Sequence, residues 1–322
     1  MISFRYHIVS IVSVFLALAI GVALGGGPLE GEVDKTLAEQ AEQDRRVMAD
    51  LRSQVAALEG GNRFTDEFAS SVAPRVLAES LQGRPVSLLV LPGAEDQTVS
   101  SLAELVEVAG GTVSGTVRAG QGLVDVGNKQ LVDELVSQLL DGVDDVTVPD
   151  AAGTYERLGV LLARAIATDE DAGARVDDAA NSILSGLSTA DLMSPAGDMT
   201  RRGSVVLVVG GAGAEDDAAR EGASAIVTAL VDAIDQATDG VVVAGPADTA
   251  RNGGVVESVR SEVGTAQEVS TVDTLDRSAG QVVTLLALAE QAGGSTGHYG
   301  SIEAPDGVMP GAAEETVEGD NG

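Results

Sequence analysis

Between Ile8 and Leu29 the chain carries no charged residue, and this segment constrains the fold more than any other. A helix of ~20 apolar residues, rising ~1.5 Å per residue, crosses the ~30 Å hydrocarbon core of a bilayer. The run exceeds the roughly 7–15 apolar residues typical of a secretory signal, and Ala23-Leu24-Gly25 is a weak match to its cleavage site. A helix packed on a soluble domain would show a polar face, which this one lacks. We therefore predict an uncleaved transmembrane anchor over residues 8–27, with cleavage as the alternative.

The charges that flank the anchor indicate its orientation. Arg5 and His7 precede it, whereas Glu30, Glu32 and Asp34 follow it. Because basic flanks stay on the cytoplasmic side, residues 1–7 are expected to form a cytoplasmic stub and the bulk of the chain to be extracytoplasmic. The sequence thus predicts a single-pass protein of the cell membrane or envelope, and leaves open whether the membrane is the inner or the outer one.

Composition limits the partners of the remaining chain. The net charge of -31 would repel phosphates, which argues against a nucleic-acid partner. The chain has no cysteine, so it has neither disulfides nor thiolate ligands. Its hydrophobic content of 44% is sufficient for the core of one or two domains.

A weak coiled coil is predicted for residues 29–60. Apolar residues recur at alternating spacings of four and three, while Gln40, Asp44 and Gln54 occupy the other seam positions. The apolar seam residues are Val33, Leu37, Val47, Leu51 and Leu58. We expect Gly60-Gly61 to end this helix. A single solvated helix is the alternative.

A stripe of small residues runs along the anchor. It consists of Ser13, Ala17, Gly21 and Gly25. Small residues at intervals of four let two membrane helices approach closely, although chance placement is an equal alternative in a chain with 40 glycines. Because the predicted coiled coil follows directly, the two segments together favour a parallel homodimer.

Residues 62–300 are expected to form an α/β domain with a helical lead-in at Thr65–Leu81. Short continuous apolar runs predict buried strands, which alternate with helical patterns. The strands are expected at Val86–Gly93, Thr112–Val117, Ser204–Gly211, Gly240–Pro246 and near Glu268–Ser270. The helices are expected at Asp96–Ala109, Asn128–Leu140, Tyr155–Ala167, Ala172–Leu187, Asp216–Ala237 and Ser278–Ala292. This alternation is typical of a three-layer, Rossmann-like domain with a mostly parallel sheet.

Two features flank this pattern. The stretches LVLPGAED (Leu89–Asp96) and LVVGGAGAED (Leu207–Asp216) both run from a predicted strand through a glycine turn to a helix start. This similarity indicates an internal duplication, with chance as the alternative. The acidic tail, residues 301–322, has no periodicity and is rich in Gly, so we expect it to be disordered.

No catalytic or cofactor-binding residue is predicted, and the chain is not expected to be an enzyme. Glu215 and Asp216 would repel a phosphate at the helix start after the second glycine turn. Gly293-Gly294-Ser295-Thr296-Gly297 matches a nucleophile elbow formally but follows a predicted helix rather than a strand. No metal ligand is assigned. Among the methionines, only Met193 and Met199 are spaced to bind a soft metal together, and surface-loop methionines without a metal are the alternative.

Three motifs resemble a known family. They are Met1-Ile2-Ser3-Phe4-Arg5-Tyr6-His7 with Val14 to Gly21; Asn62-Arg63 with Phe68, Pro74 and Leu81-Gln82-Gly83-Arg84; and Gly280 to Val283, Leu288 to Gln291 and Gly297-His298-Tyr299-Gly300. Over roughly residues 1–300 the chain is similar to the actinobacterial family of mycobacterial copper transport protein B.

This resemblance implies an envelope protein with a role in copper efflux or homeostasis or in channel formation, with copper as the transported ion and no assigned ligand residues. A related member is described as a cell-separation protein, which controls peptidoglycan hydrolases through a membrane partner. The alternative function is therefore a non-catalytic, dimeric scaffold that acts through a protein partner in the envelope or membrane.

Overall fold

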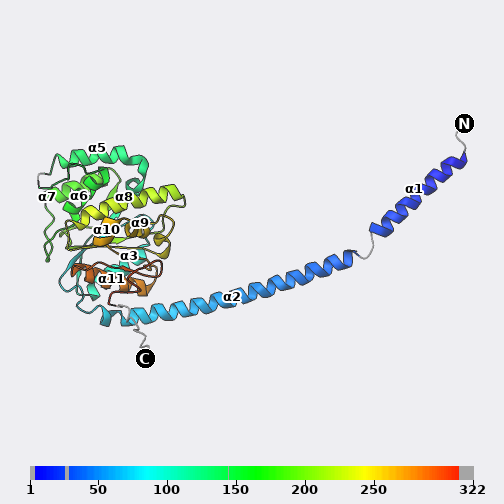
Figure 1. The fold of residues 1–322 in the computed structure, drawn as a ribbon, viewed down its shortest axis with the longest axis horizontal. Coiled ribbons are helices and arrows are strands. Elements are labelled where there is room, and N and C mark those ends of the chain that lie inside the picture. Colours follow the sequence, from blue (N-terminus) through cyan, green and yellow to red (C-terminus); the bar gives the residue numbers. More distant parts are fainter. Residues whose placement is uncertain (1–3, 26–28, 144, 312–322) are drawn as a thin grey trace, which may run out of the picture. The chain divides into compact units, whose positions relative to one another are not determined.

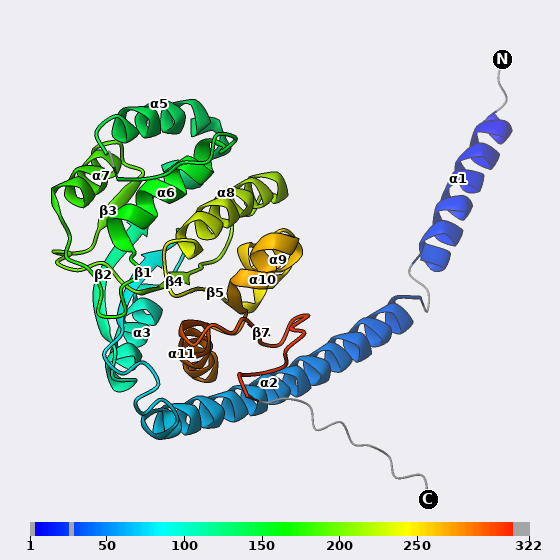
Figure 2. The same cartoon turned by 60° about the vertical axis from the view of Figure 1, so that its left-hand side comes forward.

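The computed structural model describes residues 4–25, 29–143 and 145–311, with only the backbone described for residues 4, 24 and 29–38. The chain divides into two compact units, Met1–Phe64 and Thr65–Gly322. Most of the helices are labelled in Figure 1, and most of the strands are labelled in Figure 2.

The first unit is helical. Helix α1 (Phe4–Gly25) has 22 residues, which corresponds to a length of about 33 Å. Among the described residues, its segment Arg5–Ala23 is the one candidate span that is long and apolar enough to cross a membrane. Large apolar side chains such as Phe15 and Leu18 are mostly exposed along it. Residues 8–25 of the predicted anchor therefore belong to a helix of membrane-spanning length, and its last two residues, 26 and 27, lie outside the described residues.

Helix α2 (Leu29–Val76) is longer than predicted. The expected helix end at Gly60-Gly61 is wrong, because neither glycine adopts the positive φ that ends a helix. Two glycines in a helix cost only about 1 kcal/mol each relative to alanine, and burial of Ala69 and Ala73 further along favours continuation. The predicted second helix, Thr65–Leu81, is the end of α2 and stops at Val76, two residues after Pro74.

The second unit contains a seven-stranded sheet of order β3-β2-β1-β4-β5-β6-β7. The strands are β1 (Pro85–Val90), β2 (Thr112–Ala119), β3 (Met193–Pro195), β4 (Val205–Val209), β5 (Val241–Ala244), β6 (Ser270–Val272) and β7 (His298–Tyr299). All neighbouring pairs are parallel except β2 and β3. The structure confirms the predicted α/β class with a mostly parallel sheet.

Alternate strand residues face two separate apolar clusters. Leu89, Val208 and Val243 lie in the first cluster, while Leu88 and Leu207 lie in the second. This follows from the period of two along a strand, which sends successive side chains to opposite faces. Helices cover both faces, so the unit has three layers (Figure 2).

The helices divide between these faces. Those that contribute to the first cluster are α4 (Gln121–Val124), α5 (Lys129–Leu140), α6 (Thr154–Ile166), α7 (Asp178–Thr189), α8 (Asp217–Asp235) and α9 (Val255–Ser261), with the 3-10 helix η2 (Ala247–Ala250). The second cluster includes α3 (Asp96–Val108), α11 (Ser278–Ala292) and Ala73 near the end of α2. The 3-10 helix η1 (Val126–Asn128) and α10 (Val263–Glu268) complete the fold.

Helix α7 begins at Asp178 instead of Ala172, which corrects the predicted start. Asp177 caps it by accepting a hydrogen bond from Ala180 N at 2.9 Å. Hydrogen bonds from the Arg164 guanidinium and from Ala180 N lower the pKa of Asp177 to about 2. The residues before the cap instead form a turn and a bridge between Arg175 and Arg201.

A buried ion pair between Arg260 and Asp273 holds the residues that follow strand β7. Asp273 is fully buried, and its carboxylate lies 3.0 Å from Arg260 Nη1. The same carboxylate accepts hydrogen bonds from Ser301 N at 2.7 Å and Ile302 N at 3.1 Å. Gly300 has a φ of 138°, and a Cβ there would overlap the Asp273 carboxylate, which explains the glycine.

Residues 301–311, expected in the disordered tail, are thus part of the described fold at least where Ser301 and Ile302 are held. The error arose because these residues have no periodic pattern, whereas the distant Asp273 holds the backbone amides of Ser301 and Ile302. Residues 312–322 lie outside the described residues, so disorder there stays a prediction.

Candidate functional site

The predicted packing residues of the anchor lie on one face of α1. Ser13, Ala17, Gly21 and Gly25 follow each other at intervals of four, which places them along a single helix face. A Cβ at Gly21 or Gly25 would meet no atom within 4 Å. The Ser13 hydroxyl donates to Val9 O at 2.8 Å, so its polar group is satisfied within the helix. This face is free of bulky side chains at these positions, and its use as a contact stays a prediction.

Part of the predicted seam can be located on α2. The exposed fractions of Val47, Leu51 and Leu58 are 52%, 51% and 68%. Val33 and Leu37 lie in the stretch 29–38, where side chains are outside the described residues. Met48 and Val55 are also exposed, which the strict heptad reading overlooked. These side chains leave an apolar surface along the helix.

Met193 and Met199, the methionine pair considered for a soft metal, belong to the packing of the first cluster. Met193 lies in β3 with 2% exposure. Met199 is packed against the same cluster and covers Gly115, where an added Cβ would lie 2.6 Å from Met199 Cγ. Both side chains therefore fill apolar space.

His298 in β7 is engaged by the fold. Its Nδ1 lies 3.0 Å from Thr271 Oγ1, and its Nε2 lies 3.0 Å from Ala266 O. Burial and the nearby Arg260 lower the pKa of this imidazole, which favours the neutral ring. Within the described residues, no group of three or more His, Asp or Glu side chains could hold a metal ion.

The formal nucleophile-elbow match occupies the connection between α11 and β7. Helix α11 ends at Ala292, and β7 begins at His298. An elbow needs the opposite order, a strand followed by a helix. The prediction that a helix precedes Ser295 is correct, and the strand β7, which was not predicted, follows it.

The two glycine turns meet at the carboxyl edge of the sheet. They follow β1 and β4, which are adjacent parallel strands. The chain leaves β1 toward β2 on one side and later enters β4 on the other, which makes this point a topological switch. A Cβ at Gly211 would overlap the backbone of Gly93, so the turns touch through their main chains. Gly93 also has a φ of 84°, which glycine adopts without strain.

Carboxylates already occupy the helix starts beside these turns. Asp216 Oδ1 accepts a hydrogen bond from Ala219 N at 2.9 Å and so caps α8. Asp96, at the start of α3, pairs with Arg118 at 2.7 Å. An incoming phosphate would compete with these carboxylates for the positive potential of the helix starts.

Two cavities border the turn after β4. One, of about 230 Å³, lies beside α8 and η2 and has an apolar floor that includes Leu91, Val227 and Val255. The other, of about 350 Å³, is lined by residues at the start of α3 and before α11. Both are lined by Gly211, Ala212 and Asp248. Ligands of open α/β sheets bind in such crevices outside the carboxyl ends of strands.

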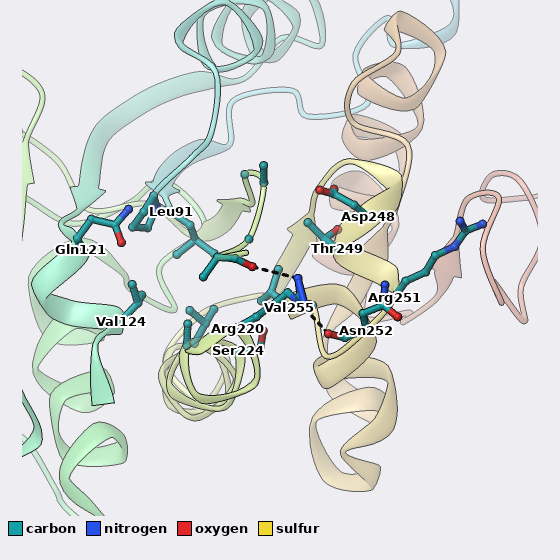
Figure 3. A pocket seen from close by; sticks show the side chains of 18 residues that line it. Leu91, Gln121, Val124, Arg220, Ser224, Asp248, Thr249, Arg251, Asn252 and Val255 are labelled. Atoms are coloured by element: carbon teal, nitrogen blue, oxygen red, sulfur yellow. Dashed lines mark hydrogen bonds between the residues drawn. The ribbon is translucent and has the colours of Figure 1, made fainter. Parts of the chain in front are cut away.

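Arg220 of α8 fixes the rim of the smaller cavity (Figure 3). Its Nε donates to Asn252 O at 2.9 Å, and its Nη1 donates to Ala214 O at 3.0 Å. Its Nη2 pairs with Asp217. The guanidinium therefore joins the turn after β4 to the loop before α9. Sequence reasoning missed this cavity, although the paired Gly-Ala-Glu-Asp turns marked the edge on which it lies.

Comparison with known proteins identifies relatives along nearly the whole chain. The family model described as "Copper transport outer membrane protein, MctB" matches residues 1–310. "Copper transporter MctB" of Mycobacterium tuberculosis is 28% identical over 306 residues, which cover 94% of this chain and 96% of the relative. The protein of the same name from Mycobacterium leprae is 29% identical over 310 residues, which cover 93% of this chain and 96% of the relative.

These relatives carry a transport name and not that of an enzyme class. Within the described residues, no feature supports the cell-separation role that was the alternative. The match over residues 1–310 confirms the resemblance drawn from the three sequence motifs: the chain belongs to the MctB family of copper transport proteins.

Proposed function

We propose that this protein takes part in copper efflux or homeostasis at the cell envelope, without catalysing a reaction. The observation that carries the proposal is the family match over residues 1–310, together with relatives named copper transporters. In this proposal copper is the transported ion. The family resemblance implies that the assembled protein transports it by forming a channel.

Helix α1 holds the protein in the membrane in this proposal. Its candidate span, Arg5–Ala23, supports insertion by length and composition. Basic residues before the span and acidic residues after it support a cytoplasmic N-terminus. Residues 1–7 are then the cytoplasmic stub, 8–27 the anchor, 29–60 the coiled coil and 62–300 the extracytoplasmic domain.

A parallel homodimer is part of the same proposal. The small-residue face with Gly21 supports close helix packing in lipid, where dispersion contacts replace the hydrophobic effect. The exposed Val47, Leu51 and Leu58 support a second contact outside the membrane. Each contact alone is weak, but the first raises the effective concentration of the second. A further protein partner in the envelope stays a prediction, which affinity capture of the full-length protein from membranes would test.

Growth in copper tests the proposed function. We expect a strain that lacks this protein to be inhibited at lower copper concentrations than its parent, and the full-length chain to restore growth. Zinc provides the control, because a general envelope defect would sensitise the strain to both metals. Equal copper tolerance of the deletion strain and its parent would contradict the proposal.

Cross-linking tests the dimer. The chain has no cysteine of its own, so a single cysteine in place of Leu37 or Leu51 gives a clean readout in membranes. Oxidation should yield a disulfide-linked dimer at both positions, because facing seam residues lie within reach of a disulfide. A cysteine at Ser182, an exposed position of α7, is the control. Failure of both seam positions in correctly inserted protein would refute the dimer.

A further inference from the structure

Helix α2 offers two registers of the seven-residue repeat along its exposed part. Asp44, Leu51 and Leu58 recur every seven residues and are seam positions in both registers. Because α2 continues past Gly60-Gly61, it offers seam positions as far as Asn62. The registers differ in the other seam position of each repeat. The register predicted from the sequence adds Gln40, Val47 and Gln54, whereas the second register adds Ala41, Met48, Val55 and Asn62.

The exposed apolar side chains of α2 favour the second register. Met48 is 57% exposed and Val55 is 52% exposed, although both are large and apolar. With the two leucines common to both registers, they recur at spacings of three and four, which places all four on one helix face. Gln54, the competing seam residue, instead donates from its Nε2 to Asp50 Oδ2 at 2.8 Å. Val47 is exposed as well and lies at the border of this apolar face.

The exposed part of the seam ends near Asn62. Further along α2, Ala69 is only 7% exposed, and Ala73 belongs to the second apolar cluster of the α/β unit. From there the helix packs within its own chain. Residues 41–62 therefore form an apolar face of about three repeats that is not covered by the described part of the chain.

We propose that residues 41–62 pair with the same residues of a second copy of this chain in the second register. This proposal rests on the parallel homodimer proposed above and specifies which side chains form its seam. Met48 and Val55 then occupy the a positions of the repeat, and Leu51 and Leu58 occupy the d positions. Leucine at d combined with a β-branched residue at a favours two-stranded parallel coiled coils. Burial of these four side chains supplies the affinity.

Charge complementarity supports a second copy as the partner. In a parallel coiled coil, each seam side chain inserts between four residues of the facing helix. For Asp44 at a d position, these include Arg45 at the e position of the second copy, so the carboxylate meets a cation as well as its twin. Within the described residues Arg45 makes no ion pair, whereas Arg46 already pairs with Glu42 of its own helix. In the first register Arg45 lies at a b position, on the outer side of the helix.

Asn62 supplies a second polar contact in the proposed register. It is exposed on α2 and occupies an a position. A single asparagine at an a position specifies the register and the number of strands, at a cost in stability, because it is best satisfied by its twin across the seam. In the first register Asn62 lies outside the seam. The proposed register therefore gives a role to each polar residue that interrupts the apolar face.

Single cysteines in the full-length protein in membranes test the register, in a chain that has no cysteine of its own. On oxidation, Met48→Cys and Val55→Cys should form disulfide-linked dimers, because facing seam residues reach the Cα separation of about 4.4–6.8 Å that a disulfide spans. Val47→Cys and Gln54→Cys, each one residue earlier, are the matched controls and should link several-fold more slowly. All four residues are exposed, so these substitutions leave the core of the α/β unit unchanged.

Leu51→Cys and Leu58→Cys lie at the seam in both registers, so they report the dimer itself. If these two link, and the two control positions link as fast as Met48→Cys and Val55→Cys or faster, the proposed register is overturned while the dimer stands. If neither leucine position links in correctly inserted protein, the dimer is refuted and the register with it. None of these outcomes depends on the copper phenotype.

A matched pair of charge changes tests the contact with Asp44. With Leu51→Cys as the reporter, Arg45→Gln should reduce cross-linking by about two- to fivefold at low salt, as expected for loss of a solvent-exposed ion pair. Arg46→Gln changes the net charge equally but removes only a pair within one helix, so it should have little effect. Equal effects of the two substitutions would overturn the proposed contact between Arg45 and Asp44.

Discussion

Removal of the Asp273 carboxylate should destabilise the α/β unit more than any surface change. Asp273 is fully buried and the Arg260 side chain is only 10% exposed, so Asp273→Ala leaves a buried cation with one partner fewer. Two backbone amides, those of Ser301 and Ile302, lose their acceptor as well. Breaking a buried ion pair by removing one partner typically costs about 3–5 kcal/mol.

This cost can be converted into a midpoint shift. A domain of this size loses about 2–4 °C of thermal midpoint per kcal/mol, so the expected fall is about 6–20 °C. Pulse proteolysis of the full-length protein in membranes, after heating to a series of temperatures, measures the midpoint. The matched control is Asp276→Asn, since Asp276 is 50% exposed and lies 3.7 Å from Arg277. Its free energy of unfolding should change by less than about 0.5 kcal/mol.

A double-mutant cycle separates the pair from the other contacts of Asp273. Arg260→Met added to Asp273→Ala removes the unpaired charge, so the double variant should lose at least about 1 kcal/mol less than the sum of the single variants. The reasoning is refuted if Asp273→Ala shifts the midpoint no further than Asp276→Asn. It is also refuted if the loss of stability in the double variant equals the sum of the losses in the two single variants.

Three further predictions concern other parts of the chain. In the same proteolysis assay, Gly211→Ala should destabilise the second unit by about 1–3 kcal/mol, because the added Cβ would overlap the backbone of Gly93. Gly264→Ala in α10 should instead stabilise it by about 0.5–1 kcal/mol, because the added Cβ meets no atom within 4 Å. Burial, with the negative charge of Glu268, raises the pKa of Asp235 to about 7, so the folded state binds a proton that the unfolded state releases near pH 4. The stability that the neutral carboxyl contributes is therefore present below pH 4 and is lost as the pH rises to 7. Allowing for solvent screening, Asp235→Asn should stabilise the protein by about 1–2 kcal/mol at pH 8 and hardly at pH 4. An equal effect of this substitution at the two pH values would contradict the prediction. Gly21→Leu and Leu51→Asp should each reduce cysteine cross-linking several-fold and together abolish it, as two weak contacts that support each other require; an unchanged yield in the double variant would exclude both surfaces.

Much of the fold could be predicted because burial on both faces of a parallel sheet leaves a direct mark on the sequence. The apolar runs of β1, β4 and β5 are short and followed by glycine turns, so their positions were predicted to within a few residues. Helix α11 was predicted with its exact bounds. The strands β3 and β7 were missed because they contain two or three residues, too few to show a period.

The remaining errors came from contacts between distant residues. Local glycine signals suggested a helix end at Gly60-Gly61, but burial of Ala69 and Ala73 favours a continuous α2. Ser301 and Ile302 have no local signal, and Asp273 holds them from elsewhere in the chain.

The candidate functional features also divide into those that local spacing predicts and those that depend on contacts between distant residues. The helical surfaces with Gly21 and Leu51 could be proposed from spacing, because a helix converts spacing into a face. The cavity beside Asp248 could not, since Leu91, Asp248 and Val255 come from separate elements that meet only in the folded sheet. Copper ligands were not predicted from the sequence, and the described residues contain no cluster of His, Asp and Glu that would supply them.

Cell-associated copper is the most direct measure of the proposed function. Parent cells, cells that lack the protein, and cells complemented with the full chain or with a chain lacking residues 8–27 are exposed to sublethal copper and analysed by elemental mass spectrometry. The account predicts that copper accumulates without the protein, returns to the parental amount with the full chain, and stays high without the anchor. The same copper content in the deletion strain and its parent would contradict it.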